Sequence, residues 1–151
     1  EFMLSANPGE PLKPLAKVAS GGEASRIMLA LKNIAARLDG IDCLIFDEVD
    51  TGISGRMAQV VAEKMAAIAR TRQVICVTHL AQLASMADVH YLIEKQVKGE
   101  ATQTMVQRLT PTQRTQEVAR LLGGEGQSGH GLLHAEEMIA AADAYKKSLA
   151  L

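Results

Sequence analysis

The stretch "DCLIFDEVDTGIS" (Asp42–Ser54) determines how the rest of the sequence is interpreted. A short apolar run that stops at two acids is typical of a buried parallel strand. In α/β proteins, ligands bind beyond the carboxyl ends of such strands. One of the two acids, Asp47 and Glu48, could hold Mg²⁺ through water, and the other could accept a proton from an attacking water. The alternative is a strand that simply runs into a polar loop.

A second strand is predicted at "QVICVTH" (Gln73–His79). If the two strands are parallel neighbours, His79 lies near the acids, where an imidazole could contact a phosphate or polarise a water. A histidine at a strand end is more often only a cap or a satisfied polar residue. Beside an acid-terminated strand, we favour the functional interpretation. Between the strands, Ser54 can cap a helix; its apolar face would comprise Met57, Val60, Val61, Met65 and Ile68.

The turn "SGGE" opens another predicted helix, Gly21–Leu38. Its two glycines allow close backbone approach, and free N–H groups with the helix dipole favour an anion there. The alternative is a capping box formed by Ser20 and Glu23 and nothing more. A helix of this length spans roughly 27 Å at about 1.5 Å per residue, so the turn and the acids of one molecule can lie far apart. Two facing copies could bring the turn of one to the acids of the other.

The remaining pattern alternates helices and strands, which predicts an α/β layered domain. Met3–Lys17 is expected to be extended or looping, and Glu1 and Phe2 resemble a cloning remnant. A turn at 98–100 should join two strands as a hairpin. The later elements are expected at Leu80–Met86 (helix), Val89–Lys95 (strand), Thr102–Leu109 (edge strand), Thr112–Leu122 (helix) and Leu132–Leu149 (helix).

Composition narrows the class of protein. The 151 residues suggest one domain, and a net charge of −1 with 3% aromatic residues gives neither a basic surface nor a stacking platform for nucleic acid. Any DNA contact should therefore come from parts that this chain lacks. Cys43 and Cys76 interrupt apolar runs and are expected to be buried thiols of a reducing cytosol. No apolar run is long enough for a membrane span, and no signal peptide is evident.

These motifs, in this order, resemble the C-terminal half of an ABC-type ATPase head. "SGGE" resembles the signature sequence, "CLIFDE" Walker B, "VDTGIS" the D-loop and "THL" the switch-histidine loop. The acid that ends "SGGE" is similar to the SMC-like branch. The wording of "ASGGEASRIMLALK", "FDEVDTGISGRMAQ", "VTHLAQLASMADVHYLIEK" and "EVARLLGG" resembles the RecN family, from about Phe2 or Met3 to Ala142, with Ala24 where leucine is expected.

The resemblance implies a fold and a set of roles. The fold would be the C-terminal lobe of an ABC/SMC-type ATPase head, with a parallel sheet core flanked by helices and a C-terminal antiparallel edge hairpin. The nucleotide would be ATP with Mg²⁺. The implied roles are Mg²⁺ support for Asp47, general base for Glu48, γ-phosphate contact for His79, dimer joining for Asp50, and contact with ATP of the opposite protomer for Ser20, Gly21 and Gly22.

One element of such a head is missing. The phosphate-loop pattern G-x-x-x-x-G-K-[ST] occurs nowhere in the sequence. RecN-like proteins carry it in an N-terminal half, beyond a coiled coil. Residues 3–151 are therefore expected to be an isolated C-terminal lobe, inactive until that half is supplied.

The implied partners are the N-terminal half, a second head joined through ATP, and DNA bound by the full-length protein. The implied process is double-strand-break repair and recombination at the nucleoid in the cytoplasm, without a membrane partner. Two alternatives stay open: a fragment of a transporter nucleotide-binding subunit, and a non-catalytic interaction module.

Overall fold

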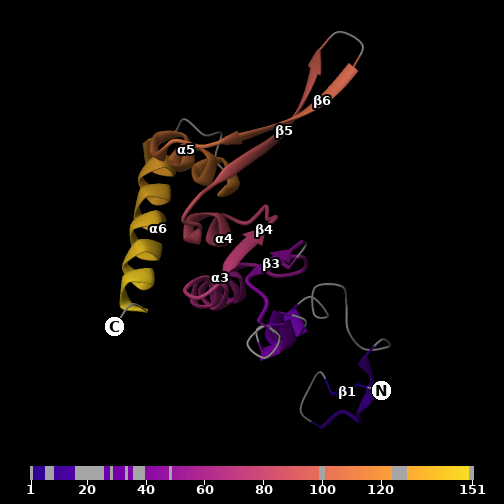
Figure 1. Ribbon diagram of the computed structural model, residues 1–151. Coiled ribbons are helices and arrows are strands. Elements are labelled where there is room, and N and C mark those ends of the chain that lie inside the picture. Colours follow the sequence, from indigo (N-terminus) through magenta and orange to yellow (C-terminus); the bar gives the residue numbers. More distant parts are fainter. Residues whose placement is uncertain are drawn as a thin grey trace. The chain divides into compact units, whose positions relative to one another are not determined.

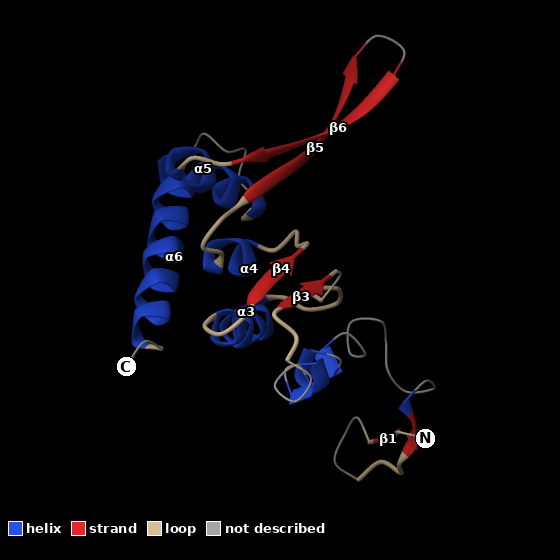
Figure 2. Cartoon of the chain, viewed as in Figure 1, coloured by secondary structure: helices blue, strands red, loops and turns tan. Residues whose placement is uncertain are grey.

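The structure is a computed structural model that separates into two compact units, Glu1–Thr78 and His79–Leu151. Figures 1 and 2 show their helices and strands. Each unit is described by itself. The described residues are 2–5, 9–15, 26–27, 29–32, 34–35, 40–47, 49–98, 101–123 and 129–149, without the side chains of 98 and 101.

The first unit begins with a small antiparallel pair. Strands β1 (Met3–Leu4) and β2 (Lys13–Pro14) are paired, and the amide of Leu15 adds a 2.9 Å hydrogen bond to the Phe2 carbonyl. This segment was expected to be extended or looping. Between the strands Gly9 adopts a φ of +89°, a conformation that glycine takes without a steric penalty.

Two parallel strands form the centre of the first unit. Strand β3 (Cys43–Phe46) pairs in parallel with β4 (Gln73–Cys76), with Ile45 opposite Ile75. The ladder continues beyond Phe46, whose carbonyl accepts a 2.9 Å hydrogen bond from Val77. Both acid-ended and histidine-ended runs are therefore strands, and their parallel pairing is confirmed.

Helix α3 (Gly55–Ala69) connects the two strands and packs against β4. Ser54 takes the N-cap position, but its side chain makes no capping hydrogen bond. The predicted apolar face is only partly correct, because Met57 and Val60 are 50% and 40% exposed. Small side chains permit close packing on that side of the helix, and the buried residues are Ala58, Val61, Ala62, Met65, Ala66 and Ile68.

The helix predicted at Gly21–Leu38 is described only in part. Residues 26–27, 29–32 and 34–35 are helical, in agreement with the prediction. Leu29 is buried at 6% exposure, whereas Ile34 is 61% exposed. The proposed cap at Ser20 and Glu23 lies outside the described residues.

The second unit contains a helical cluster and a long hairpin. Strands β5 (Tyr91–Lys98) and β6 (Ala101–Arg108) pair in antiparallel register from Tyr91–Arg108 to Lys98–Ala101. The predicted antiparallel hairpin is thus confirmed. In Figure 1 it extends away from the helices of its own unit. Its strands leave apolar side chains in solvent: Tyr91, Ile93, Val97, Met105 and Val106.

Helices α4 (Ala81–Met86), α5 (Pro111–Leu121) and α6 (Gly129–Ser148) pack on one another. Helix α5 begins with a capping box between Thr110 and Gln113. One guanidinium nitrogen of Arg114 donates to the carbonyls of Ser85 and Ala87, each at 2.7 Å. The buried core of this cluster consists of Ala81, Ala84, Val118, Ala119 and Ala135. Among the described helices, none combines the length and apolarity that crossing a membrane requires.

Candidate functional site

Side-chain alternation along β3 fixes the position of the first acid. Leu44 and Phe46 are buried at 5% and 6% exposure, while Ile45 between them is 64% exposed. Asp47 follows Phe46 and is exposed like Ile45. Successive strand residues point to opposite faces, and Asp47, which follows β3 directly, is exposed as this alternation would suggest. A solvent-accessible carboxylate at the carboxyl end of a parallel strand is suited to hold a hydrated cation.

The turn after β3 is joined to the segment after β4. Asp50 is only 2% exposed, and its carboxylate accepts a hydrogen bond from the hydroxyl of Thr78. The Asp50 carbonyl also accepts a 3.3 Å bond from the Ile53 amide. Burying a carboxylate is costly unless hydrogen bonds compensate for lost hydration. The bond to Thr78 therefore holds the two strand ends together.

Asp50 was assigned a role in joining two heads. Its carboxylate is buried and accepts a hydrogen bond from Thr78 within its own unit, and the role in joining two heads stays a prediction. Thr78 itself was not singled out in the sequence, although it stands inside the "THL" motif. A hydroxyl residue between an apolar strand and a histidine was the available signal.

The two cysteines report on the surroundings of this site. Burial raises the pKa of the Cys76 thiol to about 12, and the charges of Asp50 and Asp47 contribute to the same shift. A thiolate is thus disfavoured where the strand ends already hold carboxylates. Cys43 is exposed, so the expectation of two buried thiols is wrong for this residue. Cys43 lies two residues before Ile45, on the same face of β3.

For the other predicted site residues, the structure shows either no contact with Asp47 or no described position. His79 follows Thr78 directly and is exposed. It opens the second unit, and its closeness to Asp47 stays a prediction. Within the described ranges, no three His, Cys, Asp or Glu side chains form a metal-binding group. The remaining predicted residues, Ser20, Gly21, Gly22 and Glu48, lie outside the described residues.

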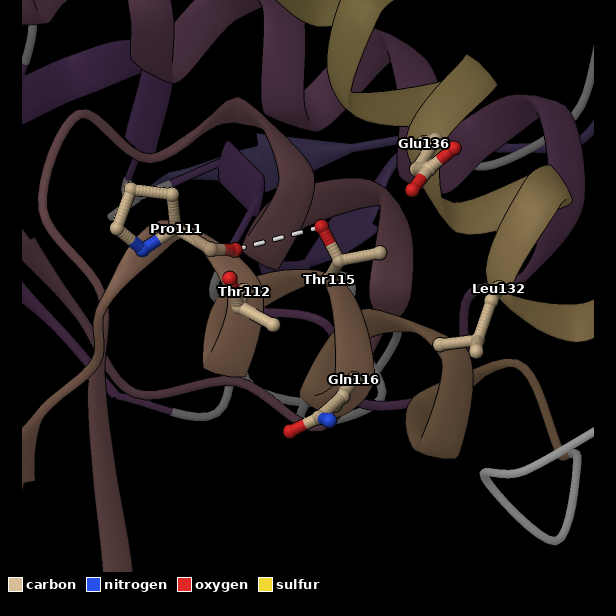
Figure 3. A pocket seen from close by; sticks show the side chains of 6 residues that line it. All are labelled: Pro111, Thr112, Thr115, Gln116, Leu132 and Glu136. Atoms are coloured by element: carbon tan, nitrogen blue, oxygen red, sulfur yellow. Dashed lines mark hydrogen bonds between the residues drawn. The ribbon is translucent and has the colours of Figure 1, made fainter.

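A pocket of about 300 Å³ lies between α5 and α6 (Figure 3). Thr115 donates a 3.3 Å hydrogen bond to the Pro111 carbonyl in its wall, which occupies that hydroxyl within the helix. Glu136 is the one charged side chain in the lining. No predicted site residue is among those that line this pocket. The full lining is Pro111, Thr112, Thr115, Gln116, Leu132 and Glu136.

Comparison with known proteins identifies related sequences across nearly the whole chain. DNA repair protein RecN of Halalkalibacterium halodurans is 50% identical over 146 residues, which are 97% of this chain and 26% of that protein. RecN of Treponema pallidum is 49% identical over 93% of this chain and 25% of its own length. RecN of Bacillus subtilis is 46% identical, with coverages of 97% and 25%. The chain therefore spans about a quarter of these relatives' length.

A structural comparison supports the fold. One solved chain, described as "Structural biochemistry of ATP-driven dimerization and DNA stimulated activation of SMC ATPases", matches with a TM-score of 0.55. The match covers 82% of this chain and 80% of that one at 17% identity. The mixed α/β fold predicted from the sequence is thereby confirmed. No protein-family model matches the chain. The transporter alternative is not favoured, because the matching sequences are RecN proteins.

Proposed function

This chain is similar to RecN proteins and spans about a quarter of their length. We propose that it is the C-terminal lobe of an ATPase head. The complete head would hydrolyse Mg-ATP in double-strand-break repair and recombination. The observation that carries the proposal is the parallel pair β3–β4, followed by an exposed Asp47 and by the hydrogen bond between Thr78 and the buried Asp50. RecN relatedness at 46–50% identity extends across these residues.

The proposed chemistry divides tasks between the strand ends. Asp47 would support a hydrated Mg²⁺, because its carboxylate is accessible to solvent. Glu48 would take the proton of the attacking water, and His79 would contact the γ-phosphate. The Asp50–Thr78 bond supports these roles indirectly, since it fixes the backbone immediately before His79. In a second head, the signature turn of Ser20, Gly21 and Gly22 would contact the same nucleotide.

The site needs a second piece of protein. The chain lacks the phosphate-loop pattern, so the lysine and amide cradle for ATP must come from elsewhere. We place them in the N-terminal half of the same protein, with the coiled coil between the halves. This lobe alone should neither bind ATP tightly nor hydrolyse it. DNA would be contacted by the full-length protein at the nucleoid, and two heads would join around ATP.

The proposal is tested by ATP turnover. The chain is assayed alone, and then mixed with the N-terminal half of a RecN protein, with and without DNA. Turnover only in the mixture supports the proposal, and Asp47→Asn in this chain should then reduce it. Turnover by the chain alone would contradict the division of the site. Halves that associate but stay inactive, even with DNA, would leave a binding module and refute the ATPase assignment.

A further inference from the structure

The hairpin of the second unit is closed at its base by His90. This residue directly precedes β5, and its carbonyl accepts a 2.9 Å hydrogen bond from the amide of Leu109, which directly follows β6. Helix α5 begins two residues after Leu109. We call the pair His90 and Leu109 the hairpin base. Figure 1 shows that the hairpin meets the helices of its own unit at this end.

The imidazole of His90 has little capacity for a second proton. Its Nδ1 atom is buried, and no described residue gives it a hydrogen-bond partner. In the same unit, the buried Nε atom of Arg114 also has no partner among the described residues. The Nε of arginine is a donor, and an imidazolium carries a proton on each ring nitrogen. Protonation would therefore make Nδ1 a buried donor without an acceptor, which is unfavourable.

Helix α5 presents a net positive charge near this ring. Glu117 is 8% exposed, and its two carboxylate oxygens accept hydrogen bonds from Arg120 at 2.6 and 2.8 Å. The carboxylate is thus neutralised by its own partner, and Arg114 adds a further positive charge. Burial lowers the pKa of His90, the charge of Glu117 opposes this shift, and the charge of Arg114 adds to it. Geometry and charge both favour the neutral imidazole.

The other elements around His90 do not supply a compensating acid. Helix α4 has no titratable side chain. Asp88, two residues before His90, is bound at 2.8 Å by Lys146 of α6, which also binds Asp143 at 3.1 Å. The acids described here are thus paired or in solvent. The charged side chains of the hairpin near its base are exposed: Glu94, Lys95 and Arg108.

We propose that His90 is a pH-sensitive switch at the hairpin base: while its imidazole is neutral the base stays closed, and protonation opens the base while the helices stay folded. Opening returns the ring to water, where a histidine takes up a proton below about pH 6.5. The open state then binds more protons than the closed state, so acid favours opening in the window below about pH 6.5. The switch requires neither nucleotide nor a second protein, and it is independent of the proposed function.

Hydrogen exchange of the Leu109 amide in the whole chain tests the switch. Protection factors, which correct for intrinsic exchange, are measured by NMR at about pH 7.5 and about pH 5.5. We expect Leu109 to lose at least about threefold in protection at the lower pH, with a limit of roughly tenfold for an ordinary histidine. The amide of Leu122, bonded at 3.1 Å to the Val118 carbonyl in α5, should keep its protection.

Three results would overturn the switch. Equal losses at Leu109 and Leu122 would show general destabilisation instead of local opening. Protection of Leu109 that does not change with pH would show that the base does not respond to protons. A Leu109 amide without protection at either pH would show that the base is not closed.

Two variants and one titration assign the effect to His90. His90→Gln keeps a polar side chain that does not titrate, so the protection of Leu109 should no longer depend on pH. His134 is exposed in α6, and His134→Gln, the matched control, should retain the full dependence. NMR titration of the His90 ring in the unmodified chain needs no variant, and its midpoint should lie below the ordinary 6.5. A midpoint at or above this value, or a pH dependence that persists in His90→Gln, would refute the proposal.

Discussion

The hydroxyl of Thr78 donates a hydrogen bond to the buried carboxylate of Asp50, and this bond joins the segments that follow the two parallel strands. Both residues lie in the first unit, and Thr78 immediately precedes His79. The turn that carries Asp50 is further anchored by Val49, which is 1% exposed. The loop with the histidine therefore begins from a fixed point.

Replacing Thr78 by valine should destabilise the first unit. The substitution keeps the side-chain shape but removes a donor from a buried carboxylate, which costs about 1–3 kcal/mol. The measurement is the free energy of unfolding from urea titrations. Thr78→Ser retains the hydroxyl and should recover most of the loss. Equal stabilities of the valine variant and the original would show that the bond is not energetically significant.

Replacing Glu48 by glutamine should slow ATP hydrolysis in the assembled head. Removal of a general base costs on the order of 10²–10⁴ in rate, while nucleotide binding should be retained. Single-turnover hydrolysis and equilibrium ATP binding measure the two effects separately. Glu63→Gln in α3, a position away from the strand ends, is the control. A rate equal to that of the original would rule out the assigned role.

The Cys76 thiol should make stability depend on alkaline pH. Its pKa is raised from 9.0 to about 12 on folding, so the unfolded chain releases this proton first. Stability should therefore fall as pH rises from about 9 toward 12, because the unfolded state binds fewer protons in that window. Urea midpoints at several pH values should decline less steeply for Cys76→Ala. Parallel curves for Cys76→Ala and the original chain would contradict the shift.

Replacing Arg114 by methionine should destabilise the second unit. Its guanidinium bonds at 2.7 Å to the Ser85 and Ala87 carbonyls connect α5 to the end of α4. Hydrogen bonds to charged groups contribute about 1.5–3 kcal/mol. Circular dichroism during urea unfolding measures the loss. The exposed Arg108 is the matched position, where Arg108→Met should change stability by less than about 0.5 kcal/mol.

Much of the fold follows from local signals in the sequence. Apolar runs that end at acids or at histidine predicted β3 and β4. A short apolar run is a sufficient signal for a strand that is buried on one or both faces. The helix predicted at Thr112–Leu122 agrees with α5, Pro111–Leu121. The predicted apolar face of α3 was partly wrong, because it was assigned from the large apolar residues alone. The buried face also contains alanines such as Ala58. Which side of a helix is buried depends on the element that packs against it. The local sequence of the helix does not contain this information.

The types of residue in the candidate site could be predicted from the sequence, but the hydrogen bond that joins two of them could not. A strand that stops at Asp47 indicates where a cation could bind, because parallel strands present their carboxyl ends together. The bond between Asp50 and Thr78 joins residues far apart in sequence, so it required the register of β3 against β4. Cys43 was assigned to the interior because its neighbours are apolar. Cys43 is exposed, because apolar neighbours in the sequence do not determine which face of the strand a residue occupies.

The alternation along β3 has an evolutionary consequence. The even-numbered Leu44 and Phe46 are buried, and the odd-numbered Ile45 and Asp47 are exposed. Inserting or deleting one residue in this strand would exchange the two sets and carry Asp47 inward. Point replacements that respect polarity can accumulate here over time, whereas single-residue gaps should be purged. The length of this segment should therefore be conserved more strictly than the identity of its residues.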